Sequence, residues 1–560
     1  MTLSYDEAAA QITAPGERFE TGEIEVRGVT YTAFTTVPGS LRDLFDLTRG
    51  YGVTTFLVYE DESYTYDQVY EAADGLAAAL QQRYGVAKGD RVAIAMRNYP
   101  EWIITYLATL SIGAIVVSMN AWWTPAELDY GLEDSGVKVL VADAERVERS
   151  RVSAARLGIA TVGVRLTDDA ATAEDVDRWG DVVEPGATFE RVDIAPDDDA
   201  TILYTSGTTG RPKGAVSTHR AIVQALMGFS CKATIDSLRR PEEAAGRTGT
   251  PVFILIVPLF HVTGNVPVFL GSLASGLKLV IMHKWDPERA LQLIEREKVT
   301  NFVGVPTQSW DLLEHPDFAK YDTSTLTSVG GGGAPAPPQL VNRVANAFTS
   351  AKPNIGYGMT ETNAYGPGNS GIDYTTHPTS TGRSTPILKI EIRGPDANPV
   401  PVGTRGEIYM LGPNLIRGYR NRPEATAETF VDGWLRTGDL GRVDEEGFVY
   451  IEDRAKDMIL RGGENVYSAE VEAAIYEHPA VYEAAVFGVP HERLGEEVAA
   501  AIVPRPGLEI DPDDLTAFLK ERIAPFKVPT KLMTLTEALP RNPAGKILKR
   551  HLRDQFSPDA

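Results

Sequence analysis

The stretch Tyr204-Thr-Ser-Gly-Thr-Thr-Gly-Arg-Pro-Lys-Gly214 follows directly on a short apolar strand predicted over residues 201–204. Its glycines let the backbone approach a ligand closely, while its hydroxyl groups and Lys213 supply hydrogen-bond donors and a positive charge. This composition predicts a loop that cradles a polyphosphate. The loop differs from a Walker A motif, because Pro212 stands where that motif has glycine before the lysine. A flexible surface loop is the plain alternative, but it would not explain Pro-Lys-Gly at this spacing after a buried strand.

Apolar strands and helical stretches alternate on both sides of this loop. Strands are predicted over 92–96, 115–118, 137–142, 252–257, 277–282, 301–305 and 326–329. The clearest amphipathic helix between them is Glu288–Lys298, in which Ala290, Leu291, Leu293 and Ile294 recur at helical spacing. Short, continuously apolar strands between helices indicate a mostly parallel sheet that is covered on both faces. The predicted fold class is therefore α/β, with a large N-terminal domain of layered, mostly parallel sheets and helices.

The sequence pattern changes after Ile387. Segments 389–393, 406–411 and 448–451 alternate more between Gly and Pro turns, which predicts an antiparallel, barrel-like β subdomain. After about Arg454 a smaller α+β unit begins. Its helices are predicted over 469–476 and 515–523, and its strands over 484–489 and 498–503. The chain is thus expected to divide into a large body and a small C-terminal domain.

Size, charge and cysteine content exclude several classes of protein. The 560 residues exceed the size at which a single hydrophobic core stops growing. A formal charge of −23 argues against a nucleic-acid-binding surface, which needs a net basic face. The lone cysteine, Cys231, cannot form an intramolecular disulfide, and no motif around it indicates a nucleophile. A reducing, cytoplasmic setting fits this cysteine usage.

No membrane segment is expected. The first residues, Met1–Glu7, lack the basic and apolar regions of a signal peptide. Residues 102–126 and 251–277 are long enough to span a membrane and carry no charge apart from His261. Glycines, prolines and a β-branched strand interrupt these runs, so both are interpreted as buried pieces of the α/β core.

Seven segments resemble the motifs of the adenylate-forming superfamily, which holds acyl-CoA synthetases, the adenylation domains of peptide synthetases and firefly-type luciferases. They stand in the family's order: Tyr204–Gly214, Gly331–Pro335, Tyr357–Glu361, Trp434–Asp439, Asp453–Asp457, Gly462–Asn465 and Asn542–Lys546. The matches run from about residue 199 to the C-terminus, and the alternation over 66–143 also suits the family. Seven matches in order are specific where one alone is not. The resemblance is closest to fatty-acid or related carboxylic acid:CoA ligases.

The resemblance assigns most of these motifs to ATP. The β- and γ-phosphates would be held by Thr205, Ser206, Gly207, Thr208, Thr209, Gly210 and Lys213. The adenine site would be formed by Gly333, Ala334, Pro335, Tyr357 and Gly358, with the aromatic ring stacking on the base. Glu361 is similar to the carboxylate that holds Mg²⁺, and Thr360 would touch the α-phosphate. Taken singly, Glu361 is equally typical of a solvated carboxylate, and Gly330–Gly333 of a loose turn.

Two further residues complete the implied adenylation site. Asp439 matches the family's ribose carboxylate, with Arg454 assisting from the hinge. A carboxylate suits a vicinal diol because its two oxygens accept two hydrogen bonds, although an Asp after Gly438 is also typical of a turn. Lys546 resembles the catalytic lysine, which bridges the substrate carboxylate and the α-phosphate as negative charge builds. Without its motif, this lysine would be read as a surface charge in a basic tail.

The resemblance also implies a division of labour between domains. Residues 1–453 would bind ATP and the acid, residues 454–456 would form a hinge that contains Lys456, and residues 457–560 would form a small mobile C-terminal domain. When this domain turns, Gly462 and Gly463 would line a tunnel for the pantetheine arm of coenzyme A. His261 matches a position at the mouth of the acyl pocket. A lone histidine beside apolar residues is, however, more often a satisfied core side chain.

The implied function is an AMP-forming acid:CoA ligase that uses ATP, Mg²⁺ and coenzyme A. Rival enzymes pass the acyl group to a carrier-protein thiol or an amine, or react with oxygen. A regulatory protein without catalysis is opposed by the intact Lys546, Glu361 and Asp439. The expected pocket segments are 259–270, 304–310, 331–335 and 357–366. Their mainly apolar residues favour a fatty or other apolar acid over an amino acid, whose ammonium group would need a buried Asp.

Aromatic and steroid-like acids stay open as substrates. The expected partners are small molecules, with no nucleic acid, and the chain is expected to be a monomer or a homodimer.

Overall fold

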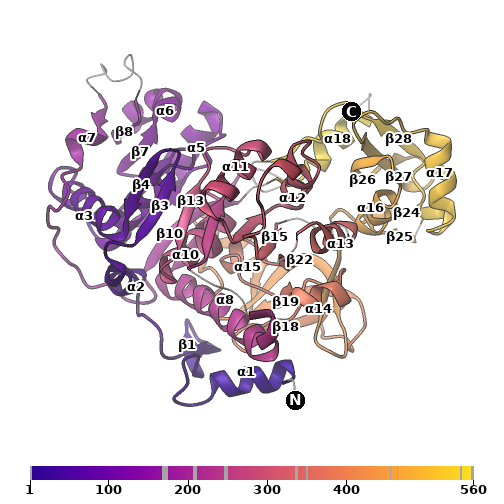
Figure 1. Cartoon of the computed structure of the whole chain (residues 1–560), viewed down its shortest axis with the longest axis horizontal. Coiled ribbons are helices and arrows are strands. Elements are labelled where there is room, and N and C mark those ends of the chain that lie inside the picture. The colour runs from indigo at the N-terminus through magenta and orange to yellow at the C-terminus, as the bar shows by residue number, and fades with distance from the viewer. Residues whose placement is uncertain are drawn as a thin grey trace.

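The computed structural model describes residues 3–166, 175–205, 211–244, 250–333, 338–348, 351–454, 456–462, 464–542 and 545–556. Figure 1 shows a large body, coloured indigo to orange, beside a smaller yellow unit that contains the C-terminus. The first helix, α1 (Tyr5–Thr13), lies at the edge of the large body. A hairpin of β1 (Thr21–Val26) and β2 (Val29–Phe34) follows it.

Two eight-stranded sheets form the frame of the large body. The first has the order β20 (Gly418–Tyr419), β11 (Lys213–Thr218), β10 (Asp199–Thr205), β6 (Ile115–Ser118), β5 (Arg91–Ala95), β7 (Val139–Asp143), β8 (Ala160–Val164), β9 (Asp177–Arg178). The second has the order β17 (Gly368–Ser370), β16 (Lys352–Gly356), β15 (Ser328–Gly332), β14 (Asn301–Gly304), β12 (Val252–Leu255), β13 (Lys278–Ile281), β3 (Thr55–Tyr59), β4 (Glu62–Thr65). Pairing is parallel through both centres and antiparallel only towards the edges. The prediction of layered, mostly parallel sheets is confirmed.

The strands of the first sheet bury both faces, as continuously apolar strands should. Val92 and Ile94 of β5 face the core that joins the two sheets, where α3 (Tyr66–Gln82), α4 (Pro100–Ser111) and α8 (His219–Arg239) pack. Ala93 and Ala95 face the opposite side, which α5 (Pro125–Ser135) and α6 (Ala144–Leu157) cover. Further helices of the large body are α2 (Leu41–Thr48), α7 (Trp179–Val182), α9 (Pro241–Ala244), α10 (Gly271–Ala274), α11 (Pro287–Glu297), α12 (Pro306–Leu313), α13 (Pro338–Ala347), α14 (Gly371–Thr376) and α15 (Pro423–Thr429).

Both uncharged runs belong to this core. Residues 102–126 contain most of α4 and all of β6, and Trp102 and Tyr106 of α4 are completely buried. Residues 251–277 contain β12 and the π-helical turn Gly264–Leu270. Among the helices of the described residues, none combines the length and apolar character that crossing a membrane requires.

The antiparallel subdomain follows the second sheet. Its strands lie in the order β18 (Lys389–Arg393), β19 (Gly406–Leu411), β22 (Trp434–Val443) and β21 (Phe430–Val431), and β23 (Val449–Arg454) also pairs with β22. The antiparallel pairing is as predicted. Where the structure describes the chain, these strands form an open sheet rather than a closed barrel, because β18 and β21 stand at its two edges.

The small unit has its own sheet and its own apolar cores. Its strands lie in the order β25 (Glu464–Val466), β24 (Ile459–Arg461), β27 (Gly495–Pro504) and β26 (Val481–His491), with β28 (Lys531–Thr534) parallel to β27. Its helices are α16 (Ser468–Tyr476), α17 (Pro512–Lys520) and α18 (Lys549–Phe556). Two apolar clusters fill this unit. The predicted α+β organisation is thus present.

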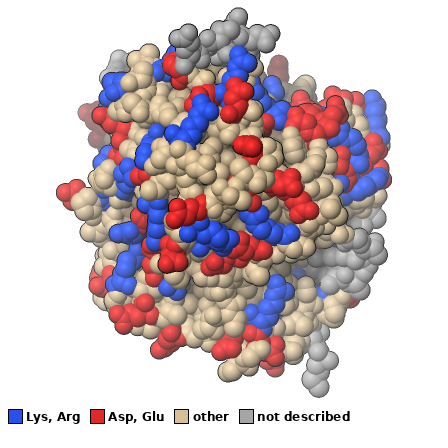
Figure 2. All heavy atoms as spheres, turned by 90° about the vertical axis from the view of Figure 1, so that its left-hand side faces the viewer, with Lys and Arg blue, Asp and Glu red and all other residues tan. Residues whose placement is uncertain are grey.

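Charges of both signs are interspersed on the left-hand face of the molecule, which Figure 2 shows. Many of them are paired. Arg165, for example, donates two hydrogen bonds of 2.8 and 2.7 Å to the carboxylate of Glu62. Many charged side chains are therefore organised into ion pairs, and some of these pairs join segments that are distant in the sequence.

Candidate active site

The base of the polyphosphate loop is formed by two paired strands. Thr205 ends β10, Lys213 begins β11, and the hydroxyl of Thr205 donates to the carbonyl of Lys213 at 3.3 Å. A Cβ at Gly214 would lie 2.9 Å from the side chain of Ile202, so glycine is needed for this close pairing. The predicted phosphate ligands Ser206, Gly207, Thr208, Thr209 and Gly210 lie outside the described residues.

Asp439 is the centre of a second group of residues. This carboxylate is 3% exposed and lies opposite Arg454 in the register of β22 and β23. The hydroxyl of Tyr357 donates to its Oδ2 at 2.5 Å, and Nε of Arg454 lies 3.2 Å from its Oδ1. Asp439 therefore stands in a strand as an oriented acceptor. Gly438, with φ +72°, precedes it within the same strand, where the register with β19 shifts.

The glycine run of the predicted adenine site is part of a strand rather than a loose turn. Gly330–Gly332 belong to β15, where a Cβ at Gly331 would lie 1.6 Å from the carbonyl oxygen of Gly304 on β14. Gly358 is also required, because its Cβ would lie 2.3 Å from the carbonyl oxygen of Ala364. Gly333 follows the strand with φ +79°. Ala334 and Pro335 lie outside the described residues.

Tyr357 is held by its hydroxyl as well as by its surroundings. Burial, and then the negative charge of Asp439, raise the pKa of Tyr357 well above its usual value. The group therefore stays protonated and donates to the carboxylate. The sequence predicts that this ring stacks on adenine, and the structure adds that the same residue orients the predicted ribose acceptor.

Glu361 and Thr360 share the short 3₁₀ turn Thr360–Thr362, and both are half-buried. Oε1 of Glu361 accepts a 2.6 Å hydrogen bond from the hydroxyl of Tyr419. Within the part of the chain that the structure describes, no three His, Cys, Asp or Glu side chains gather as a metal site. A single carboxylate suits Mg²⁺, which usually takes one or two carboxylates together with water and substrate phosphates.

Lys546 stands in a turn of the small unit, and hydrogen bonds between residues of that turn stabilise it. Its N–H donates to Oδ1 of Asn542 at 2.9 Å, and the guanidinium of Arg541 donates to the carbonyl of Gly545 at 2.7 Å. A Cβ at Gly545 would lie 2.8 Å from the side chain of Val305. The turn that carries the predicted catalytic lysine thus lies against the large body.

Four basic side chains converge at this place. Burial, followed by the charges of Arg454 and Lys456, lowers the pKa of Lys546 to about 7, and two aspartates oppose the shift. Burial and then Arg454 also lower the pKa of Lys456, with a smaller contribution from Lys213. Like charges in a partly dry site repel one another unless an anion neutralises them. The arrangement therefore suits a polyanion. It combines Lys213 of the polyphosphate loop with Lys456 and Lys546 from the C-terminal part of the chain.

The residues predicted for the acyl pocket and the pantetheine path are His261, Gly462 and Gly463. Burial lowers the pKa of His261 to about 4, so its imidazole is neutral, and its Nδ1 accepts a 3.3 Å hydrogen bond from the N–H of Thr263. This contact belongs to its own turn, and the gate role of His261 stays a prediction. Gly462 adopts φ +60°, which favours glycine, whereas Gly463 lies outside the described residues.

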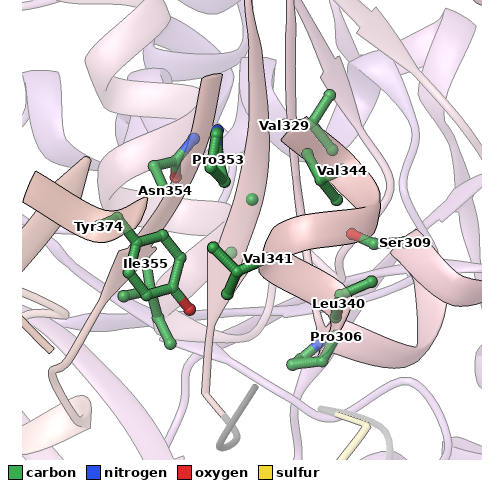
Figure 3. Close-up of a pocket in the computed structure, with 12 residues that line it drawn as sticks. Pro306, Ser309, Val329, Leu340, Val341, Val344, Pro353, Asn354, Ile355 and Tyr374 are labelled. Atoms are coloured by element: carbon green, nitrogen blue, oxygen red, sulfur yellow. The ribbon is translucent and has the colours of Figure 1, made fainter. Parts of the chain in front are cut away.

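A small apolar cavity lies behind the glycine strand. Figure 3 shows it between β15, β16 and three helices, with Pro306, Leu340, Val341 and Tyr374 among its walls. Its volume is about 30 Å³, which is room for a water molecule rather than an acyl chain. This cavity therefore does not define where the acid binds.

Comparison with known proteins decides the family. The chain matches the model for AMP-binding enzymes over residues 46–420, and the model for the AMP-binding enzyme C-terminal domain over residues 470–546. The chain belongs to the AMP-binding enzyme family. This match confirms the resemblance to adenylate-forming enzymes. With the relatives described below, it also confirms the assignment to AMP-forming acid–CoA ligases.

Two relatives of this AMP-binding enzyme are named for the acids they activate. It is 37% identical over 496 residues to a feruloyl-CoA synthase of Amycolatopsis sp, a match that covers 87% of this chain and 92% of the relative. It is 34% identical over 536 residues to the 3-[(3aS,4S,7aS)-7a-methyl-1,5-dioxo-octahydro-1H-inden-4-yl]propanoyl:CoA ligase of Rhodococcus jostii (strain RHA1), covering 93% of this chain and 99% of the relative.

Solved structures agree with this placement. The AMP-binding enzyme matches ATP-bound MatB from Rhodopseudomonas palustris with a TM-score of 0.78 and 31% identity, covering 92% of this chain and 99% of that one. It matches the amide bond synthetase McbA from Marinactinospora thermotolerans with a TM-score of 0.79 and 28% identity, at the same coverage.

Tyr419 is the residue at this site that the sequence analysis missed. It lies in β20, which is only two residues long, and no helical or strand period marks it. Its role depends on contacts with Lys213 and Glu361, which are more than fifty residues away along the chain. No local signal could have identified it.

Proposed function

We propose that this AMP-binding enzyme activates an apolar carboxylic acid with Mg·ATP and transfers the acyl group to coenzyme A. In the first half-reaction a carboxylate oxygen attacks the α-phosphorus of ATP, the bond from that phosphorus to the bridging oxygen of the β-phosphate breaks, and pyrophosphate leaves as acyl-AMP forms. In the second, the thiolate of coenzyme A attacks the acyl carbonyl carbon, and AMP leaves. The observation that carries the proposal is the meeting of Lys546 with Arg454, Lys456 and the oriented carboxylate of Asp439.

The adenylation half would use these residues in distinct ways. Asp439 would accept hydrogen bonds from the ribose hydroxyls, because its carboxylate has acceptor positions beyond those taken by Tyr357 and Arg454. Lys213 would contact the terminal phosphates. Bound phosphates would raise the pKa of Lys546 from about 7, so that a charged ammonium faces the α-phosphate where negative charge develops.

Glu361 would hold the magnesium ion that accompanies ATP. One half-buried carboxylate fits an ion that arrives with the nucleotide and keeps several water ligands. When bound, such an ion neutralises negative charge on the phosphate oxygens. The hydroxyl of Thr360 stands in the same turn and would contact the α-phosphate.

The second half-reaction would follow a turn of the small domain. We assign residues 1–453 to the large domain, 454–456 to the hinge and 457–560 to the mobile domain. The separate sheet and cores of the small unit support this division. Gly462 and Gly463 would then line the pantetheine path. We expect the enzyme to work in the cytoplasm as a monomer or homodimer, with the acid, ATP and coenzyme A as its partners.

The acid is proposed to be apolar, with fatty acids first and aromatic or steroid-like acids as alternatives. The segments expected to form the pocket are mainly apolar, and the relatives include a feruloyl-CoA synthase and a long-chain-fatty-acid–CoA ligase. A ligase for an amino acid would instead need a buried carboxylate for the ammonium group.

A panel of acids assayed for pyrophosphate release, with and without coenzyme A, tests the proposal. Fatty acids of several lengths, ferulate, a steroid-like acid and an amino acid form the panel. Release that depends on an apolar acid, with acyl-CoA appearing only when coenzyme A is present, is the expected result. Acyl-AMP that forms but passes to an amine and not to coenzyme A would favour the amide-forming alternative, which the likeness to McbA keeps in view.

A further inference from the structure

We propose that Tyr419 is a positioning residue that holds Glu361 and Lys213 in the places where Mg·ATP needs them. The inference rests on the proposed function and deepens it. Tyr419 is 8% exposed, its hydroxyl donates to Oε1 of Glu361 at 2.6 Å, and Nζ of Lys213 lies 4.4 Å from the centre of its ring. One side chain thus touches both charged groups assigned to the metal and the terminal phosphates.

The backbone around Tyr419 ties the same two segments together. In β20, Tyr419 lies opposite Ala215 of β11, the strand that begins with Lys213. On the other side, the N–H of Ile416 donates to the carbonyl of Glu361 at 3.0 Å. The short segment 416–419 therefore bridges the phosphate strand and the turn that carries the metal carboxylate.

Tyr419 is itself held in one position. Its N–H donates to the hydroxyl of Thr426 at 2.9 Å, and its ring packs in an apolar cluster with Ala215 and Ile416. Gly418, before it, has φ +148°, and a Cβ there would lie 2.6 Å from the methyl group of Thr426. A residue fixed in this way can orient others.

The chemistry of the two contacts preserves the charges that ATP and its metal would need. A tyrosine hydroxyl has an ordinary pKa of about 10, so at neutral pH it is a neutral donor. A neutral donor orients Glu361 and leaves its negative charge in place, whereas a Lys or Arg partner would cancel that charge. In the same way, the ring holds the ammonium of Lys213 by a cation–π contact without pairing it to a carboxylate.

The two contacts can be separated by substitution. Tyr419→Phe keeps the ring under Lys213 and removes the hydroxyl from Glu361, whereas Tyr419→Leu removes both contacts. Tyr450→Phe is the matched control, because the Tyr450 hydroxyl donates to Asp444 at 2.9 Å and its ring lies 4.1 Å from the guanidinium of Arg442. Tyr450 thus makes the same two kinds of contact with residues outside the nucleotide site.

The measurement is the dissociation constant of ATP, by calorimetry without acid, in excess Mg²⁺ and again in excess chelator. For Tyr419→Phe we expect Mg·ATP to bind about tenfold more weakly, the loss expected for one hydrogen bond to a charged group. Metal-free ATP should bind as it does to the wild type. Tyr419→Leu should weaken both forms, and Tyr450→Phe should change neither.

Tyr419→Phe that binds Mg·ATP like the wild type would overturn the inference, as would equal losses with and without metal. If the melting temperature of Tyr419→Phe falls, a double-mutant cycle with Glu361→Gln decides. Additive losses overturn the inference, and a double variant no worse than Glu361→Gln alone supports it. The proposed function fails separately, since its failure would be a wild type that does not bind Mg·ATP.

Discussion

The hydroxyl of Tyr357 donates a 2.5 Å hydrogen bond to Oδ2 of Asp439, while Nε of Arg454 lies 3.2 Å from Oδ1 of the same carboxylate. Both oxygens of Asp439 are therefore oriented before a nucleotide binds. If the ribose hydroxyls bind to Asp439 as we propose, orientation in advance reduces the freedom that is lost on binding, and these two contacts would add to the affinity.

Loss of this carboxylate should impair both half-reactions, because each needs the adenylate to be held. We expect Asp439→Ala to lower each rate about 10²-fold or more, as two charge-assisted hydrogen bonds disappear. Tyr357→Phe should have a smaller effect in the same direction. Separate assays of pyrophosphate release and of acyl-AMP conversion check this, with Asp444→Ala as a carboxylate control. A wild-type rate in either assay for Asp439→Ala would refute the ribose assignment.

Lys546 should impose a pH dependence on adenylation. Its pKa of about 7 in the free protein lies below the ordinary lysine value because of burial and the neighbouring cations. Since only the protonated form can stabilise developing negative charge, kcat/KM for pyrophosphate release should fall as pH rises through about 7. The fall in kcat should occur at a higher pH than the fall in kcat/KM, because bound phosphates favour the charged form of Lys546.

Lys546→Arg provides the control for this profile, since guanidinium stays protonated throughout the range. Whatever rate remains in this variant should lack the limb near pH 7. If the limb persists unchanged in Lys546→Arg, another group is responsible for it.

The glycine run Gly330–Gly333 shows which part of the fold the sequence can predict and which part it cannot. The alternation of short apolar runs was enough to predict parallel sheets, because that pattern reports burial on both faces. It could not decide whether Gly330–Gly333 was a loose turn. The answer depends on the carbonyl of Gly304 in the neighbouring strand, and register between strands is not written in local sequence.

Motif spacing likewise predicts which residues form the candidate site, but not the contacts between them. Arg454 and Asp439 both influence the charge of Lys546, and the roles that the family resemblance implies for the three residues stay predictions. The sequence does not reveal the hydroxyl contacts of the two tyrosines. Tyr357 and Asp439 are 82 positions apart, and Tyr419 and Glu361 are 58 positions apart. Only the folded arrangement brings such partners together.

Cys231 should be dispensable for catalysis. It is buried in α8, and burial raises the pKa of its thiol to about 12, so almost no reactive thiolate exists at neutral pH. Cys231→Ser should retain near-normal activity in both half-reactions, with a loss of about 1 kcal/mol in unfolding free energy for the buried hydroxyl. A thiol-blocking reagent should have little effect on the native enzyme. Complete inactivation of a folded Cys231→Ser protein would indicate a covalent route.

Two contacts hold the small unit against α12, and adenylation should depend on them. The hydroxyl of Tyr482 donates to Oδ1 of Asp311 at 2.6 Å, and Arg505 forms an ion pair with Glu314. If these contacts keep Lys546 at the proposed nucleotide site, the double variant Tyr482→Phe/Arg505→Ala should lower kcat/KM for pyrophosphate release about tenfold.

The control for this variant removes an ion pair that lies within the small unit. Arg522 pairs with Glu477 at 3.1 Å, and Arg522→Ala should leave adenylation unchanged. Conversion of supplied acyl-AMP to acyl-CoA should be normal in both proteins. Equal adenylation rates in the double variant and the wild type would show that the α12 contacts do not position Lys546.

The two half-reactions should separate when opposite faces of the small domain are changed. Lys546 meets Arg454 and Lys456 in this structure, where its charge would serve only the attack on the α-phosphate. Lys546→Ala should therefore lose pyrophosphate release and still convert supplied acyl-AMP and coenzyme A. Gly463, whose role follows from the family resemblance, should show the reverse, since a side chain in Gly463→Leu would intrude on the pantetheine path and let adenylate accumulate.

The hinge supplies the third variant of this experiment. Proline restricts φ, so Lys456→Pro should slow the turn of the small domain and leave the present arrangement able to form acyl-AMP. Burst kinetics would then show one rapid equivalent of pyrophosphate followed by slow acyl-CoA formation. If Lys546→Ala and Gly463→Leu instead depress both half-reactions equally, and Lys456→Pro shows no burst, the small domain does not alternate. A single fixed site would then have to admit both nucleophiles at the same carbonyl group.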